Sequence, residues 1–451
     1  MNPSPRKIIE PSREIDVYHE ADVVVVGGGP GGHSAAIAAA RNGARTIIIE
    51  RYGHLGGMAS GGLVILIPHM SDGGKEQQIT GLCQEWLDRL NVIGGVVGPK
   101  REEIGSTDPN VLERWKNNFS TVVDGKIRQT ATVDPEMLKC ILNDMVEEAE
   151  VKLSLHSWGT RSIVDNGRVQ GVFFESKSGR QAVLGKVIID GTGDGDLLPS
   201  AGAEYDDAID PKLRSSMLAL VFRVANCDFK KYNDFREKDP EKSRELMGEI
   251  SKVAGTMLLP VAGHRNDVVW VNNWIPGLSP ISVEDLTTLE VSVRKMMRKG
   301  HYFMKKNIPG FENSFILDTA SQTGTRGSRR LVGEYIVTGD DMRSSKKFDD
   351  TIAVIPRIGP PGDDTCSYIP YRALVPVKME GLLVAGRSFS SDKIANDSMN
   401  LIPHCCAMGE AAGTAAALAV KQGISLRKLD YKLLQKTLLK NGAALPGIEA
   451  D

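Results

Sequence analysis

The pattern of apolar and polar positions predicts its first elements near the start of the chain. Residues 22–26 form an apolar run of strand length, and the alanine-rich stretch 35–42 is typical of a packed helix. Residues 46–49 are β-branched throughout, which predicts a second buried strand ending at Glu50. Strand, helix and strand in this order predict a parallel β–α–β unit.

In the middle of the chain the hydrophobic pattern changes to the two-residue alternation that is typical of β-strands. Residues 151–158 predict a strand, and the three segments after it alternate between apolar and polar positions, with turn-rich residues between them. These segments are residues 161–164, 169–175 and 181–184. They predict an antiparallel meander, which leads into the apolar strand 186–190.

Two later stretches fit the same sheet, and two others interrupt it. Residues 381–385 predict a further strand, and a small-residue helix is expected from Asn400 to about Lys421, with Pro403 in its first turn. Residues 64–135 predict a helical insertion with polar, irregular parts.

A second interruption predicts a separate α+β substrate domain. Residues 205–330 combine the helix-like stretches 234–254 and 283–307 with the strand-like stretch 268–272. We expect a substrate to meet the rest of the protein between this domain and the parallel sheet.

Composition excludes several classes of function. Lys and Arg total 55 against 57 Asp and Glu, a formal net charge of −2, whereas a nucleic-acid binder normally carries a basic surplus. No apolar stretch approaches the ~20 residues that span a bilayer, and the charged first residues are unlike a signal peptide. The six cysteines lack the paired spacing of a metal site. We therefore expect a cytoplasmic protein with no membrane span, no bound metal and no nucleic-acid partner.

The glycine-rich loop after the first strand carries the strongest chemical signal. Gly27, Gly29 and Gly32 fit G-x-G-x-x-G between a buried strand and a helix, the context in which this motif binds a dinucleotide. The glycines let the backbone approach a diphosphate, and the helix N-terminus offers free amides and a positive dipole. Glu50 suits a ribose hydroxyl and would repel a 2′-phosphate. These residues predict FAD or NAD rather than NADP.

Longer motifs resemble one family of flavoproteins. They are Val-Val-Val-Val-Gly-Gly-Gly-Pro-Gly-Gly (residues 23–32), the glycine-rich segment 50–63, Asp-Gly-Thr-Gly-Asp-Gly-Asp (190–196), the segments 326–334, 369–374 and 385–387, and the helix opening at Pro403. From residue 20 to residue 420 the chain resembles the FAD-dependent oxidoreductases related to the flavoprotein subunit of fumarate reductase and to thiazole-synthesis enzymes. The resemblance implies an α/β fold, a Rossmann-like FAD-binding domain with an antiparallel β-meander plus the inserted α+β substrate domain. The FAD-binding domain would be discontinuous, comprising residues 20–63, 136–204 and 331–440.

The same resemblance implies a set of residues around FAD. The first glycines would line the diphosphate, Glu50 and its neighbour the adenosine, and the later segments the flavin and its ribityl chain. The full set is Gly27, Gly29, Pro30, Gly31, Glu50, Arg51, Gly57, Met58, Ser60, Gly193, Asp194, Gly386, Arg387, Asp392, Leu401 and Ile402. Arg387 stands where many flavoproteins carry an acid that binds the ribityl hydroxyls, and Asp392 is the alternative acid.

Two histidines and an acid are candidates for proton transfer. His69 and Asp72 lie in a polar loop after the flavin-side glycines, where they could act as general base or acid. An ordinary surface turn is the alternative for this loop. His404 lies at the start of the helix expected to face the flavin, and its alternative is a packing role. Covalent attachment of FAD to His54 is left open beside a packing role.

Arginines are the candidates for binding an anionic group. Arg326, Arg329 and Arg330 form the densest cationic cluster, and a guanidinium fork binds both oxygens of a carboxylate. Arg329 is the catalytic candidate among them. The alternative, favoured because the stretch matches a family motif, is that these arginines pair with acids and hold the structure together.

The function expected from all of this is an FAD-dependent oxidoreductase, a dehydrogenase or reductase. It would exchange hydride between flavin N5 and a small polar organic substrate, such as a carboxylate or a hydroxylated ring. A flavin monooxygenase, and a flavin-binding protein without redox turnover, are the alternatives. The substrate, the electron donor or acceptor and the assembly state, including a homo-oligomer, do not follow from the sequence.

Overall fold

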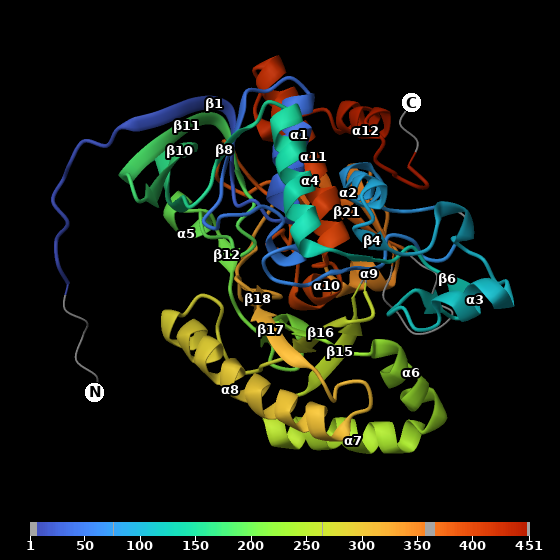
Figure 1. Ribbon diagram of the computed structural model, residues 1–451. Helices are drawn as coiled ribbons and strands as arrows, with labels where there is room; N and C mark the ends of the chain where they lie inside the picture. Colours follow the sequence, from blue (N-terminus) through green and yellow to red (C-terminus); the bar gives the residue numbers. More distant parts are fainter. Residues whose placement is uncertain (1–6, 75, 264, 357–365, 449–451) are drawn as a thin grey trace.

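A seven-stranded sheet lies at the upper left of the molecule in Figure 1, beside the helices α1, α4 and α11. The computed structural model describes residues 7–74, 76–263, 265–356 and 366–448. The strands follow the order β8-β2-β1-β11-β10-β9, with β22 also beside β11. They are β1 (Val17–Val26), β2 (Thr46–Ile49), β8 (Lys152–Ser154), β9 (Trp158–Asp165), β10 (Arg168–Ser176), β11 (Gly179–Asp190) and β22 (Leu382–Val384). Strands β8, β2, β1, β11 and β22 run parallel, whereas β9 and β10 run antiparallel, so the predicted α/β fold with its meander is confirmed.

Strand β11 corrects one detail of the prediction. The sequence predicted two strands, 181–184 and 186–190, but the structure has one strand of 12 residues that continues through Gly185. Its first half pairs with β10 and its end pairs with β22, while β1 pairs along most of its length. Gly185 stays in the strand because β1 fills the space of a side chain: an added Cβ would lie 2.7 Å from Val24 Cγ2.

Two apolar layers cover the two faces of this sheet. Val23 and Val25 of β1 belong to a core shared with the helices, whereas Val24 and Val26 belong to a second core shared with the meander. This alternation follows from the period of two along a strand. The helices of the first layer are α1 (Pro30–Arg41), α2 (Gly81–Val92), α4 (Pro135–Glu148), α11 (Ile402–Gln422) and α12 (Tyr431–Lys440).

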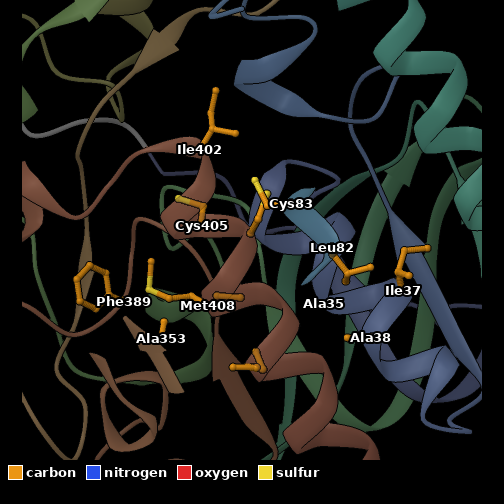
Figure 2. Packing of buried hydrophobic residues seen from close by; sticks show 14 of the residues in the cluster. Ala35, Ile37, Ala38, Leu82, Cys83, Ala353, Phe389, Ile402, Cys405 and Met408 are labelled. Carbon is orange, nitrogen blue, oxygen red and sulfur yellow. The ribbon is translucent and has the colours of Figure 1, made fainter. Parts of the chain in front are cut away.

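Helices α1 and α11 approach each other so closely that glycine is required between them. A Cβ added at Gly409 of α11 would lie 2.0 Å from the Gly31 carbonyl oxygen, and one at Gly413 would lie 2.0 Å from that of Ala35. Figure 2 shows apolar side chains of both helices: Ala35 and Ala38 lie on α1, and Met408 lies on the other side of α11, beside Phe389. The contact fixes the N-termini of α1 and α11 relative to each other.

The lower part of the molecule, at the bottom of Figure 1, is built on a four-stranded antiparallel sheet in the order β15-β16-β14-β17. Its strands are β14 (Phe222–Ala225), β15 (Leu258–Ala262), β16 (Val268–Asn273) and β17 (Phe315–Thr319), and its helices are α6 (Phe229–Lys238), α7 (Pro240–Ala254) and α8 (Val283–Asn307). The predicted helix 234–254 is two helices, because Pro240 begins α7 and the Asp239 side chain caps it by accepting from Lys242 N at 3.0 Å. This part of the chain has its own apolar core.

The segment 64–135, expected to be helical, also contains strands. β3 (Leu66–Ile67), β7 (Ala131–Val133) and β4 (Val96–Val97) form a small antiparallel sheet beside α2. The segment also holds α3 (Pro109–Trp115), β5 (Val122–Val123) and β6 (Lys126–Ile127). Runs of two or three residues are too short to produce a periodic signal.

The remaining elements connect these parts. They are α5 (Leu198–Ala201), β12 (Tyr205–Asp206), β13 (Leu218–Ala219), β18 (Gly324–Thr325), β19 (Arg330–Leu331), α9 (Gly339–Arg343), β20 (Thr351–Pro356), β21 (Cys366–Pro370) and α10 (Lys393–Ser398). Within the described ranges, no helix combines the length and apolar character needed to cross a membrane.

Candidate functional site

A cleft opens at the carboxyl ends of the parallel strands, where open α/β sheets bind ligands. It comprises about 670 Å³, counted to the open solvent, between the ends of β1, β2, β11 and β22. The predicted cofactor residues that line it are Gly27, Gly29, Pro30, Gly31, Glu50, Arg51, Gly57, Met58, Gly193, Gly386 and Arg387. Stretches far apart in sequence therefore meet around one cleft.

The glycine loop shapes one wall of the cleft through its backbone. A Cβ added at Gly32 would lie 1.8 Å from the Gly27 carbonyl oxygen, so this glycine allows the helix to begin. At Gly29 the nearest atom to an added Cβ is 4.0 Å away, which leaves the space beside it to the cleft. Gly29 is also the N-cap of α1 and has no side-chain hydrogen bond to the first helical amides. Free amides at a positive helix end suit a diphosphate.

Glu50 is held in place by backbone donors at the end of β2. Its Oε2 accepts from Gly28 N at 2.5 Å and its Oε1 accepts from Tyr52 N at 2.8 Å. Burial raises the pKa of Glu50, and the two backbone donors oppose that shift. A carboxylate has about four acceptor positions, so two remain for ribose hydroxyls.

Arg51 lies between two aromatic rings on the same side of the cleft. Its guanidinium carbon is 5.0 Å from the centre of the Tyr52 ring and 5.7 Å from that of Trp158. The carboxylates of Asp194 and Asp196 act on it electrostatically. Tyr52 and Trp158 also line the cleft, which gives this end a planar, partly cationic surface suited to a nucleobase and its ribose.

Arg387 forms a buried ion pair at the base of the cleft. Its Nη2 lies 2.8 Å from Asp194 Oδ1, which also accepts from Ser328 Oγ at 2.7 Å, and it donates to Thr325 Oγ1. Burial would raise the pKa of Asp194, but the charge and hydrogen bond of Arg387 outweigh it and hold the pKa below its usual value. Asp194 is therefore an anion that fixes Arg387, rather than a cleft-lining residue.

Other predicted site residues have structural partners. Arg329 Nη1 lies 3.1 Å from Asp196 Oδ1, which corresponds to the structural alternative for this arginine. Asp392 accepts from Ala395 N at 2.7 Å as the cap of α10, and from Gly339 N at 2.8 Å. The Ser60 hydroxyl donates to the Leu55 carbonyl. These side chains lie outside the set that lines the cleft.

The N-terminus of α11 reaches the cleft next to the start of α1, because Gly409 packs against Gly31. Leu401 is its N-cap and Ile402 its first residue, and Cys405 lines the cleft. His404 has no exposed surface, and neither ring nitrogen has a hydrogen-bond partner among the described residues. Burial lowers the pKa of His404 to about 3, a shift that the nearby Met399 carbonyl opposes without a hydrogen bond of good geometry.

His69 lies within electrostatic range of His404, whereas the side chain of Asp72 forms a local turn. His69 is buried, its backbone adopts a left-handed φ of 58°, and its Nδ1 has no hydrogen-bond partner in the described part of the chain. Burial lowers its pKa to about 4, and each histidine lies within electrostatic range of Arg214. Asp72 instead accepts from Gly74 N at 2.7 Å, which is the predicted turn.

His54 lies beside the cleft. Its Nε2 is 3.2 Å from Ser321 Oγ, and its ring stacks on Tyr52 with 5.5 Å between the ring centres. Burial lowers its pKa. Covalent attachment through His54 stays a prediction.

Sequence reasoning missed several residues of the cleft. They include Tyr52, Ser157, Trp158 and Gln322. Tyr52 directly follows the predicted Arg51, so extending that motif by one position would have found it. Trp158 and Gln322 come from segments whose patterns predict only a strand end and a loop, so the sequence offered no signal for them.

Comparisons with known proteins give relatives that match parts of the chain. Digeranylgeranylglycerophospholipid reductase 2 of Methanopyrus kandleri is 28% identical over 172 residues, which are 38% of this chain and 37% of that protein. Dihydrolipoyl dehydrogenase of Trypanosoma brucei brucei is 56% identical over 41 residues, 9% of each chain. The chain thus matches well under two thirds of the length of these relatives.

Solved structures match more of the chain at lower identity. A geranylgeranyl bacteriochlorophyll reductase-like protein from Thermoplasma acidophilum has 15% identity and a TM-score of 0.47, covering 94% of this chain and 83% of its own. A p-nitrophenol 4-monooxygenase from Pseudomonas putida has 13% identity and a TM-score of 0.48, covering 94% and 86%.

A family model covers nearly the whole chain. Residues 22–438 match the family described as FAD dependent oxidoreductase, which includes the glycine loop, the cleft and the helix α11. The narrower resemblance to fumarate reductase flavoproteins and thiazole-synthesis enzymes stays a prediction, since the two curated relatives named above are a digeranylgeranylglycerophospholipid reductase and a dihydrolipoyl dehydrogenase. The chain belongs to the family of FAD-dependent oxidoreductases, and its cofactor is FAD.

Proposed function

We propose that this enzyme is a dehydrogenase or reductase that exchanges hydride with a small polar organic substrate, such as a carboxylate or a hydroxylated ring. The observation that carries the proposal is at the start of α11. Cys405 lines the cofactor cleft, and its neighbour His404 is buried within electrostatic range of His69 and of the exposed Arg214. A polar group of this kind beside a cofactor cleft is where a substrate would be bound and oriented.

The residues of the cleft fit FAD. Gly29 leaves space beside a helix end with free amides, and Glu50 retains acceptor positions for ribose hydroxyls. The residues that would hold FAD are Gly27, Gly29, Pro30, Gly31, Glu50, Arg51, Gly57, Met58, Gly193, Gly386 and Arg387, joined by Tyr52 and Trp158. When bound, FAD supplies the hydride donor or acceptor at N5.

The residues beside the start of α11 would act on the substrate through hydrogen bonds and charge. Burial lowers the pKa values of His69 and His404 to about 4 and about 3, so both imidazoles are neutral at pH 7. A neutral imidazole can accept a proton or donate a hydrogen bond. His404 directly precedes Cys405 in α11, and Cys405 lines the cleft. We therefore assign proton transfer to His404, with His69 orienting the substrate.

The test begins with the visible spectrum of the purified protein, before and after acid precipitation. A flavin band that moves into the supernatant shows noncovalent FAD, whereas colour that stays in the pellet directs mutagenesis to His54. Anaerobic bleaching by a panel of organic acids and alcohols, or reoxidation of the reduced enzyme by unsaturated acids, then tests hydride exchange. A protein that is colourless and cannot be reconstituted with FAD would contradict the proposal.

The alternatives have their own outcomes in the same experiment. Oxygen consumption coupled to hydroxylation of a substrate would identify a monooxygenase. A flavin that no donor reduces, in a protein of unchanged stability, would favour a flavin-binding role without turnover. The electron partner, the cytoplasmic location and the assembly state stay predictions.

A further inference from the structure

Arg326 is a mostly buried cation without a neutralising partner of its own. It follows β18, and across the described ranges its side chain makes neither an ion pair nor a hydrogen bond. Its nearest aromatic neighbour is Trp274, whose ring centre is 6.0 Å from the guanidinium carbon. Burial lowers the pKa of Arg326 to about 10, so the side chain is still charged at pH 7. A buried charge without a counter-charge is costly and is normally retained only where it binds something.

The charges around Arg326 leave an excess of one cation. Asp397 is the acid that acts on it electrostatically, but this carboxylate also lies 3.4 Å from Arg214 Nε and accepts from Ser215 N at 2.6 Å. Two guanidinium groups thus share one carboxylate. The imidazoles of His69 and His404 add no charge at pH 7, because burial lowers both pKa values.

A further arginine, which lies within electrostatic range of His69, does not change this count. Arg128, which acts on His69, is 3.6 Å from its own acid, Asp124. Arg128 and Asp124 together are neutral, so the excess stays at one positive charge.

Short links place this excess charge next to the cofactor cleft. The hydroxyl of Thr325, the residue before Arg326, accepts from Arg387 in the cleft. The Arg326 carbonyl accepts from Asn400 Nδ2 at 3.0 Å, and the Asn400 carbonyl is 3.7 Å from the thiol of Cys405, which lines the cleft. Arg326 therefore lies directly after β18, where the chain leaves the lower part of the molecule and meets the start of α11.

The histidines of the same group offer hydrogen-bond positions. Both ring nitrogens of His404 and Nδ1 of His69 are buried and lack hydrogen-bond partners in the described part of the chain. Buried polar atoms without partners are rare, and a bound ligand is one of the few arrangements that satisfies them. His69 also holds a left-handed φ of 58°, a conformation that concentrates at functional sites.

We propose that Arg214, Arg326, His69 and His404 form a subsite for an organic acid with a single carboxylate. The Arg326 guanidinium binds the carboxylate, and the two imidazoles hydrogen-bond to neutral hydroxyl or keto oxygens of the same molecule. A dicarboxylate or a phosphate dianion fits less well, because its second negative charge would be buried without a partner. The inference rests on the proposed function, since the acid would be the substrate of the hydride exchange.

The experiment titrates the FAD-loaded protein with lactate, pyruvate, benzoate, succinate and inorganic phosphate. Binding is followed by isothermal calorimetry and by the flavin difference spectrum, in wild type, Arg326→Gln and Arg326→Lys. We expect saturable binding of monocarboxylates, at least about tenfold tighter than that of succinate or phosphate. Arg326→Gln should weaken it by about tenfold or more, and Arg326→Lys by less, because the charge stays but the fork is lost.

Thermal unfolding separates this role from a structural one. Because Arg326→Gln removes a buried charge without its own acid, the variant should unfold at a temperature equal to or above that of wild type. Arg265→Gln is the matched control, since Arg265 is exposed, lies between β15 and β16, and pairs with Asp267 at 2.7 Å. It should bind the acids as wild type does.

Three results would overturn the inference. They are the absence of saturable monocarboxylate binding, tighter binding of succinate or phosphate, and unchanged binding in Arg326→Gln. The FAD content and anaerobic reduction of the same preparation report the proposed function independently. Carboxylate binding that depends on Arg326 in a protein that no donor reduces would retain the subsite and reject hydride exchange.

Discussion

The two ends of the candidate site are made from different parts of the chain. At the end beside α1, the wall is backbone, and the residues that shape it lie within residues 27–32. Beside the start of α11, the proposed subsite would instead be built from side chains, and His69, Arg214, Arg326 and His404, which lie outside the set that lines the cleft, come from four distant segments. Backbone recognition is local and leaves a motif, whereas side-chain recognition is assembled only by folding.

The two ends also differ in how well their polar groups are satisfied. Glu50 at the first end accepts from two backbone amides, and Asp194 at the base is paired with Arg387. At the second end, His404 has no partner among the described residues and Arg326 has no acid of its own. Cofactor binding therefore uses a preformed site, and the substrate end keeps unsatisfied groups for a ligand.

The largest effect expected comes from comparing Gly32→Ala with Gly29→Ala. At Gly32 the new Cβ would meet the Gly27 carbonyl oxygen at 1.8 Å, so the apoprotein should misfold or lose several kcal/mol of stability. At Gly29 the nearest atom is 4.0 Å away, so the apoprotein should stay as stable as wild type but bind FAD about a hundredfold more weakly. Urea unfolding and FAD titration measure both. Normal FAD affinity in Gly29→Ala would show that the diphosphate lies elsewhere.

Breaking the buried pair at the base should have the next largest effect. Arg387→Met leaves Asp194 buried without its cation, so the free energy of unfolding should fall by about 3–5 kcal/mol. The double variant Arg387→Met/Asp194→Leu removes both charges and should recover at least half of that loss. Denaturant unfolding of the apoproteins measures the cycle, and a double variant less stable than Arg387→Met would contradict the buried-pair assignment.

The pH dependence of stability sharpens the contrast at the other end. The pKa of His404 is about 3 in the folded protein and 6.5 as the ordinary value, so between these pH values only the unfolded chain takes up the proton. Stability contributed by the neutral ring is complete above pH 6.5 and is lost as the pH falls toward 3.

His404→Gln should remove this dependence. The free energy of unfolding of the variant should fall by about 1.4 kcal/mol less per pH unit than that of wild type, which is roughly 2 kcal/mol between about pH 6 and pH 4.5. Urea unfolding across this range, compared with the exposed His156→Gln, isolates the contribution of His404 from that of the other groups. Parallel curves for wild type and His404→Gln would show that the ring is charged or solvated.

The smallest expected effect is a gain in stability rather than a loss. Gly248 lies inside α7 with no atom within 4 Å of an added Cβ, unlike the glycines that α11 packs against α1. Gly248→Ala should raise the free energy of unfolding by about 0.5–1 kcal/mol, because alanine restricts the unfolded chain and favours the helix. Thermal and urea unfolding measure it, and a destabilised variant would indicate a contact that this helix face does not show.

The sequence by itself determined the cofactor end. Gly27, Gly29, Gly32 and Glu50 lie within a single β–α–β unit, where the spacing of residues along the chain already sets their positions in space. The meander and α11 were also predicted, because their periods extend over enough residues to be read. Local signals failed where a neighbouring element decided the outcome, as at Gly185, which β1 keeps within a continuous strand.

Only the tertiary structure decided the substrate end. The sequence grouped Arg326 with Arg329 and favoured a structural role for both, with Arg329 as the catalytic candidate, whereas folding pairs Arg329 with Asp196 and leaves Arg326 without an acid of its own. It likewise separates His69 from Asp72 and brings it to His404, more than 300 residues later in the chain. Charge neutralisation and burial depend on which segments meet in space, and no property of one segment records where the other will lie.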